Sequence, residues 1–285
     1  MTVVTRAVLT YLKRHWLILS FLILVICFAM LPGAIERMFV YFPIKGLSGS
    51  PSDLGLTYQD VFLTTEDGVR LHGWFVPHPD AGYTLLLFHG NAGNISHRLP
   101  WIELLHPLAV NIFLVDYRGY GRSGGSPFEE GLYRDARAAY AWWRSEIAGA
   151  AKKLVLVGES LGGAVAVDLA AREPVAGLIL QSTFNSARDM ARTVMPLGLL
   201  QPLARIHFDS AAKISSVRCP IFFIHGNRDG IVPLHLGRKL FDAAPGPKDF
   251  YEVDGAGHND LLWISGHELA ARLRSFLARL ETAPQ

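Results

Sequence analysis

Gly158-Glu159-Ser160-Leu161-Gly162-Gly163 is the stretch that decides how this chain folds. The apolar run Leu154-Val155-Leu156-Val157 precedes it and an alanine-rich run over residues 164–171 follows it, so the local order is strand, sharp turn and helix. In a G-x-S-x-G turn at such a junction the backbone is strained, the serine Oγ is exposed, and glycines replace the Cβ atoms that would clash. This context favours Ser160 as a nucleophile. An ordinary glycine-rich turn is the alternative.

Short apolar runs alternate with helical stretches on both sides of this turn. The predicted strands cover residues 61–63, 71–76, 84–88, 112–115, 154–157, 178–180, 221–224 and 250–253. The predicted helices cover residues 129–146, 161–172, 234–243 and 268–280. Near-continuous apolar runs are typical of strands buried on both faces of a parallel sheet. The alternation predicts an α/β fold, with a mainly parallel central sheet, helices on both faces and right-handed crossovers.

Two features depart from this alternation. The first two strands are joined through Glu66-Asp67-Gly68, a turn signal, so we expect them to form an antiparallel pair. Residues 185–215 form a longer connection with many apolar side chains, which Pro196 and Pro202 divide into short helices. We expect a short cap or lid there, because such insertions lie above the carboxyl edge of the sheet. The alternative is that these side chains only complete the core.

A serine nucleophile needs a base that takes its proton and an acid that orients the base. With a nucleophile elbow of this type, the partners follow the serine in the order acid, then histidine. Asp229 lies in a loop after the strand at 221–224. His258 lies between glycines in a loop after the strand ending near Val253. We therefore predict a triad of Ser160, Asp229 and His258.

Other histidines and carboxylates are weaker candidates for these two roles. His235 begins a predicted helix close behind Asp229, and His267 lies in the terminal helix, so neither occupies a loop after a strand. Asp254 and Asp260 are rival acids. Both are so near His258 in the sequence that they reach its Nδ1 less easily.

The tetrahedral intermediate of acyl transfer needs backbone N–H donors. One should come from Leu161, at the N-terminus of the helix after the nucleophile. The other should come from His89-Gly90-Asn91-Ala92-Gly93-Asn94, the loop after the strand at 84–88, with the Asn91 N–H preferred to that of Ala92. Asn94-Ile95-Ser96 also matches a glycosylation sequon, a match that we attribute to chance because it lies inside this loop.

A second glycine-rich loop covers residues 116–124, Asp-Tyr-Arg-Gly-Tyr-Gly-Arg-Ser-Gly. It lacks the strand and G-x-G-x-x-G layout of a dinucleotide site, so we expect it to pack beneath the elbow. The His, Cys and Glu residues show no spacing suited to a metal. We therefore predict neither a cofactor nor a metal.

Composition bounds the class of protein. The chain has 285 residues, of which 50% are hydrophobic, enough for one large α/β core. The net charge of +2 and the lack of a basic cluster argue against nucleic acid as a partner. Cys27 lies in an apolar run and Cys219 opens a predicted strand, so we expect no disulfide.

The N-terminus is different in kind. Residues 16–35 carry no charge over a length that can span a bilayer as a helix. Arg6, Lys13 and Arg14 precede this stretch, which favours an N-terminus in the cytoplasm and a domain on the other side. We expect a tail and single-pass anchor over residues 1–40 and a catalytic domain over 41–285, with the aromatic segment 38–43 at the membrane interface.

Three alternatives to an uncleaved anchor remain. A cleaved signal peptide would need a small-x-small site, and none follows the apolar core clearly. The residues around Cys27 resemble a lipoprotein box only faintly, because the preceding residue is bulky. A buried core helix is improbable for so long an uncharged run at a terminus.

With these residues in place, the chain resembles the membrane-anchored α/β-hydrolase-domain serine hydrolases. The resemblance covers nearly everything after residue 40 and depends on four motifs: residues 89–94, 117–121, 158–163 and 257–260. It implies an α/β-hydrolase fold, an N-terminal anchor, no cofactor, and hydrolysis of acyl esters or thioesters, including lipid and protein-acyl substrates. Family members with N-terminal cysteine clusters are targeted by palmitoylation. Only Cys27 is present here, so that property is not carried over.

The expected function is a membrane-anchored serine hydrolase that works through an acyl-enzyme, with an acyl ester or thioester and the bilayer as its partners. Two alternatives stay open. The same triad could cleave peptides or other bonds, because one fold hosts unrelated chemistries. The chain could also be a non-catalytic, membrane-tethered binding protein, although a complete triad argues against that.

Overall fold

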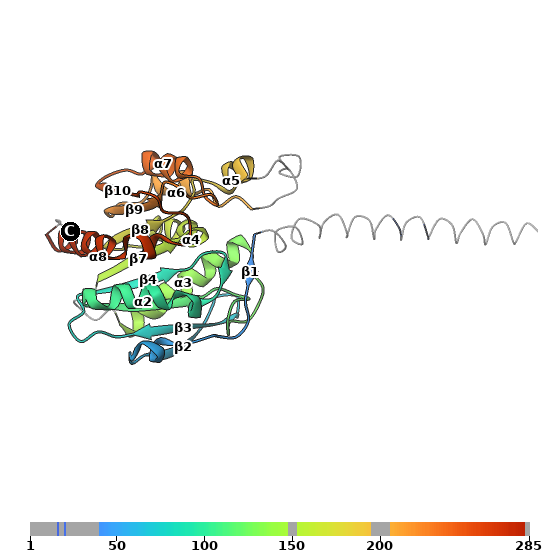
Figure 1. Ribbon diagram of the computed structural model, residues 1–285. Helices are drawn as coiled ribbons and strands as arrows, with labels where there is room; N and C mark the ends of the chain where they lie inside the picture. The colour runs from blue at the N-terminus through green and yellow to red at the C-terminus, as the bar shows by residue number, and fades with distance from the viewer. Residues whose placement is uncertain (1–15, 17–19, 21–39, 148–152, 195–205, 283–285) are drawn as a thin grey trace, which may run out of the picture.

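An eight-stranded sheet organises the computed structural model, which describes residues 40–147, 153–194 and 206–282 together with Trp16 and Ser20. The strand order is β10-β9-β8-β7-β4-β6-β3-β2 (Figure 1). The strands are β2 (Gln59–Thr64), β3 (Arg70–Val76), β4 (Tyr83–Phe88), β6 (Val110–Asp116), β7 (Lys153–Glu159), β8 (Gly177–Gln181), β9 (Ile221–Gly226) and β10 (Lys248–Val253). β2 and β3 pair antiparallel, as do β3 and β6, and the other pairs are parallel. The predicted sheet and its antiparallel pair are confirmed.

Helices cover both faces of this sheet. Successive side chains of a strand point to opposite faces, and those of β4 divide accordingly: Leu86 and Phe88 belong to one core cluster, Leu85 and Leu87 to the other. The first cluster includes side chains of α3 (Glu129–Glu146), α4 (Leu161–Ala170), α6 (Ser210–Ile214) and α7 (Leu234–Ala243). The second includes side chains of α2 (Leu99–Leu105) and α8 (Leu261–Thr282). The predicted two-sided arrangement is confirmed.

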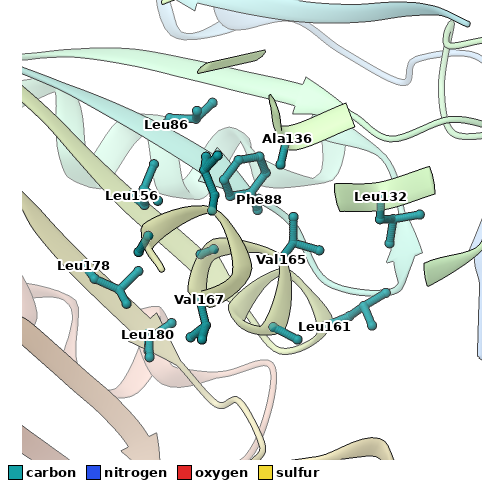
Figure 2. Packing of buried hydrophobic residues seen from close by; sticks show 14 of the residues in the cluster. Leu86, Phe88, Leu132, Ala136, Leu156, Leu161, Val165, Val167, Leu178 and Leu180 are labelled. Carbon is teal, nitrogen blue, oxygen red and sulfur yellow. The ribbon is translucent and has the colours of Figure 1, made fainter. Parts of the chain in front are cut away.

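α4, the helix after Ser160, is buried along its whole length. A helix that is apolar on every side belongs in a core. Figure 2 shows Val165 and Val167 of this helix among leucines of β4, β7 and β8, with α3 close by. Ser160 therefore lies at the N-terminus of a helix that is packed on all sides.

Several short elements escape prediction. They are β1 (Phe42–Pro43), β5 (Ala92–Gly93), α2 and the 3₁₀ helices η1 (Pro51–Leu54), η2 (Ile95–Arg98) and η3 (His106–Leu108). α5 (Ala187–Val194) and α6 are short helices within 185–215, as predicted for that connection. α8 also begins earlier than the predicted helix at 268–280, with a kink at Ser265. β10 is an edge strand, which explains why several of its side chains are exposed.

The described ends of the 185–215 connection are joined to each other and to the core. The Ala187 N–H donates to His207 O, and the Ala211 N–H donates to Asn185 O. Phe208 is buried in the core cluster that also receives Met190. These ends favour the core-completing interpretation. The centre of the predicted cap, residues 195–205, lies outside the described residues.

The predicted membrane anchor lies outside the described residues except for Trp16 and Ser20, and so does the predicted tail. Within the ranges that the structure describes, no helix combines the length and the apolar character needed to cross a bilayer.

Candidate active site

The serine turn has the geometry that the sequence predicts. Ser160 has φ 52° and ψ −114°, a conformation that costs a non-glycine residue of order 1–3 kcal/mol. A Cβ on Gly158 would lie 2.6 Å from Gly162 O, and one on Gly162 would lie 2.0 Å from Phe88 O. Both positions therefore require glycine. The Ser160 N–H donates to Gln181 O (2.8 Å), and the Thr183 hydroxyl donates to Ser160 O (2.8 Å), which hold the turn in place.

Asp229 and His258 meet at the same edge of the sheet. They follow β9 and β10, parallel neighbours whose carboxyl ends lie side by side, and Ser160 follows β7 in the same orientation. The His258 Nδ1–H donates to Asp229 Oδ2 at 2.7 Å. The side chain of Asp229 is fully buried and that of His258 nearly so. The structure thus brings two of the three predicted residues into contact.

The rival groups do not share this contact. Asp254 accepts from the Asn227 side chain, and Asp260 accepts from the Gly257 N–H. His235 and His267 lie exposed on α7 and α8. Of the described carboxylates, Asp229 is the one that pairs with His258.

Four donors surround the Asp229 carboxylate. Oδ1 accepts from the N–H groups of Ile231 and Val232, at 2.9 and 2.8 Å. Oδ2 accepts from His258 and lies 3.4 Å from His225 Nε2. Burial alone would raise the pKa of Asp229, but the interactions with His225, His258 and the Val232 N–H outweigh it and hold the pKa well below its usual range. This carboxylate is therefore an anion at neutral pH, suited to orient and stabilise an imidazolium.

His225 is a functional residue that the sequence reasoning missed. Its ring is buried, and its Nε2–H donates to Val232 O at 2.8 Å while facing Asp229. Gly237 packs closely against this ring, because a Cβ at position 237 would lie only 2.4 Å from His225 Nδ1. A signal was present, because His225 is the next-to-last residue of β9, a buried strand that leads directly into the loop carrying the acid.

Ser160 is 6% exposed and makes its hydrogen bonds through its backbone. Among the described residues no hydrogen bond joins Ser160 Oγ to His258. Bonds of this kind are often long in a free enzyme and tighten around a bound substrate, so the arrangement is compatible with proton transfer between the two side chains.

One predicted N–H donor, Leu161, lies at the N-terminus of α4, and the other, Asn91, lies in the loop at 89–94. Leu161 is the first residue of α4, where the N–H has no partner within the helix. The Asn91 side chain donates to Val40 O, and Asn91 O accepts from the Tyr120 hydroxyl at 2.8 Å. Asn94 of the sequon is fully buried and donates to the chain around Ile44, a structural role that agrees with a chance match.

The second glycine-rich loop supports the loop at 89–94: the Tyr117 hydroxyl donates to His89 O and that of Tyr120 to Asn91 O. Its packing beneath the elbow stays a prediction. An ion pair joins η2, the short helix that follows the loop at 89–94, to Glu159 of the elbow. Arg98 donates to both carboxylate oxygens of Glu159, at 2.7 and 3.2 Å.

No three His, Cys, Asp or Glu side chains gather into a possible metal site within the described ranges.

Comparison with known proteins defines the family. A family model described as alpha/beta hydrolase fold matches residues 83–204. The alpha/beta hydrolase domain-containing protein WAV2 of Arabidopsis thaliana is 36% identical over 262 residues, which cover 83% of this chain and 85% of WAV2. The chain belongs to the α/β-hydrolase family.

Two further likenesses accompany this assignment. An uncharacterised protein of Mycobacterium tuberculosis is 40% identical to this α/β-hydrolase over 250 residues, covering 87% of this chain and 88% of its own. The structure of the Pyrococcus furiosus esterase Pf2001 matches with a TM-score of 0.70 and 25% identity, over 84% of this chain and 98% of that one. Family and fold together support a hydrolase.

Proposed function

We propose that this α/β-hydrolase is a serine esterase or thioesterase that works beside a membrane on lipid or acylated substrates. The observation that carries the proposal is the contact of His258 with the buried anion of Asp229, at the sheet edge where Ser160 occupies its strained turn. The likeness to a protein named as an esterase supports the same chemistry.

The proposed reaction proceeds through an acyl-enzyme. Ser160 Oγ attacks the acyl carbonyl carbon while His258 Nε2 takes the hydroxyl proton and Asp229 stabilises the imidazolium. The N–H groups of Leu161 and Asn91 bind the oxyanion. Collapse breaks the bond to the alcohol or thiol, which leaves with the proton from His258. A water molecule then gives a proton to His258, attacks the acyl carbon and releases the acid, and Ser160 recovers its proton.

Exposed apolar side chains on segments next to the site residues favour a lipid or acylated substrate. Phe42 and Ile44, at β1 beside the loop at 89–94, are 48% and 50% exposed. Ile231 follows Asp229 and is 48% exposed, and Trp263, at the start of α8 after the His258 loop, is 94% exposed. Together with the uncharged stretch at 16–35, these groups favour a site at a lipid surface, with the domain on the extracytoplasmic side of a single-pass anchor.

Labelling by a fluorophosphonate probe tests the nucleophile. We expect the full chain to be labelled and Ser160→Ala to lose the label completely, because the probe forms a bond to an activated serine Oγ. Ser182→Ala is the matched control: this serine is also buried and has a positive φ at a strand end, but it follows β8. Undiminished labelling of Ser160→Ala would exclude the assignment.

Turnover of a substrate panel tests the reaction class. We expect kcat/KM for p-nitrophenyl butyrate and for longer acyl esters or thioesters to exceed that for aminoacyl amides. A preference for the amides would assign a peptidase to the same residues. Absence of turnover together with absence of labelling would indicate a binding protein.

A further inference from the structure

We propose that β1 and Tyr120 form a strap that orients the oxyanion loop, which we define as residues 89–94. Tyr120 is then a positioning residue, and the segment that enters the domain at residues 40–46 is part of the active site. This inference depends on the proposed esterase function, because it assigns a role in binding the oxyanion.

The strap begins with the pairing of β1 and β5. The two short strands run parallel, with Phe42 opposite Ala92 and Pro43 opposite Gly93. The Phe42 N–H donates to Asn91 O at 2.9 Å, and the Ile44 N–H donates to Gly93 O at 3.0 Å. A segment distant in the sequence thus bonds directly to the loop that is expected to supply an oxyanion donor.

Tyr120 supplies the second bond to the same carbonyl. Its hydroxyl donates to Asn91 O at 2.8 Å, and its ring is fully buried, with its centroid 5.1 Å from that of His89. Burial raises the pKa of Tyr120 well above its usual range, so the hydroxyl keeps its proton and remains a donor. Asn91 O therefore receives two donors, the full capacity of a carbonyl oxygen.

Fixing this carbonyl fixes an N–H group. A trans peptide is planar, and its C=O and N–H point in opposite directions. Holding Asn91 O toward Phe42 and Tyr120 therefore aims the Ala92 N–H away from the strap. The preceding peptide is fixed likewise, because the His89 Nδ1–H donates to Gly90 O at 2.7 Å and so directs the Asn91 N–H. Neither N–H donates to another described residue.

The strap is itself secured at several points. The Asn94 side-chain amide donates to Ile44 O and Gly46 O, at 3.0 and 2.6 Å. The Gly121 N–H donates to Ile44 O at 3.0 Å, and Lys45 Nζ donates to Ser123 O at 2.8 Å. Donors that are fixed before charge develops stabilise an oxyanion without reorganising during the reaction. The strap provides this preorganisation.

Tyr120→Phe in the full chain tests the inference. Removal of a whole oxyanion donor costs roughly 100- to 1,000-fold in kcat. The Asn91 carbonyl and the Asn91 N–H share one Cα, so loss of one of the two bonds that hold this carbonyl should misalign the donor and lower kcat for p-nitrophenyl butyrate by about 10-fold. KM should stay within about twofold, because the ground-state ester carries little charge for the donors to bind. Affinity for butylboronic acid, whose tetrahedral adduct places an anionic oxygen in the hole, should fall as kcat does.

Tyr140→Phe is the matched control. This buried tyrosine also donates to a backbone carbonyl, Pro174 O at 3.5 Å, but away from the site. Its kcat and boronate affinity should equal those of the wild type. If Tyr120→Phe fails to fold, Phe42→Pro removes the other donor to Asn91 O and Phe42→Ala retains it. The proline variant alone should then lose kcat and boronate affinity.

The two proposals fail in distinguishable ways. An unlabelled wild type without ester turnover would contradict the esterase function itself. An active wild type whose Tyr120→Phe or Phe42→Pro variant keeps kcat and boronate affinity would overturn the strap alone. Equal falls in the Tyr120→Phe and Tyr140→Phe variants would also overturn it, because they would point to a general loss of stability.

Discussion

Asp229 shows how one buried carboxylate is kept charged. Two backbone N–H groups and two histidine rings face it, and together they outweigh the cost of burial. Because its pKa is depressed in the folded state, the folded chain binds fewer protons there than the unfolded chain does. The resulting stability is present above the unfolded value near 3.8 and is lost as pH falls toward the folded value.

Asp229→Asn should therefore destabilise the protein in a pH-dependent way. The loss of unfolding free energy should be largest near pH 6 and shrink as the pH falls below about 4, where the wild type loses the same contribution. Urea denaturation of the full chain in detergent at several pH values measures this. Asp254→Asn is the control, since that carboxylate does not contact His258, and a surface change of this kind stays within about 0.5 kcal/mol. A deficit for Asp229→Asn that does not vary with pH would contradict the prediction.

At the scale of elements, α7 supports the acid by packing closely against β9. Gly237 of α7 lies over the ring of His225, so that a Cβ would come within 2.4 Å of Nδ1. The buried ring cannot retreat without moving away from Val232 and Asp229. A helix glycine therefore positions a side chain on a neighbouring strand.

Gly237→Ala should destabilise the protein and lower its proposed esterase activity. Alanine gains about 1 kcal/mol over glycine in helix propensity, but overpacking a tight core costs about 1–3 kcal/mol. The clash should prevail and displace His225 from Asp229. Thermal unfolding and kcat/KM for p-nitrophenyl butyrate measure the two effects.

Gly266→Ala in α8 is the matched control for this helix substitution. A Cβ there would meet only Leu104 Cδ1, at 3.9 Å, an ordinary contact. Its propensity gain should raise the melting temperature with activity unchanged. Equal behaviour of the two variants would show that helix propensity, and not the contact with His225, decides the outcome.

At the scale of the whole molecule, Arg118 joins three distant parts of the chain. Its guanidinium donates to Asp67, in the turn between β2 and β3, and to Asp135 of α3, from the loop after β6. Its side chain is 2% exposed. Burial raises the pKa of Asp135 to about 6 even though Arg118 lowers it. The charged form of Asp135 therefore depends on its ion pair with Arg118.

Arg118→Met should cost about 3–5 kcal/mol of unfolding free energy, because it leaves the Asp135 charge buried without a partner. Without Arg118 the pKa of the buried Asp135 carboxyl rises further, so the folded variant keeps a proton that the unfolded chain has released. The stability of the variant therefore falls as pH rises. The deficit should therefore be larger at pH 8 than at pH 5, as urea denaturation would show. Arg122→Met, at an exposed pair with Asp60, should cost about 1 kcal/mol or less. A similar loss in both variants would contradict the argument.

The predicted strands and helices agree with the structure because their signals are local. β7, the turn at Ser160 and α4 depend on neighbours in the sequence, and the run 129–146 coincides with α3. What escaped prediction depends on distant partners. β1 is too short to show a pattern, and it forms only because residues 91–93 lie beside it. The role of His225 becomes visible only when Gly237 and Asp229 close around its ring.

The sequence by itself determined the class of fold and the serine turn, because apolar periodicity and the glycines at 158 and 162 act through the backbone nearby. It also determined the order of the candidate acid and base. Only the tertiary structure decided that His258 pairs with Asp229, since that choice depends on which strand ends meet. Only the tertiary structure decided that the entering segment and Tyr120 hold the oxyanion loop. Hydrogen bonds between residues far apart in the chain exist only after the sheet has brought them together.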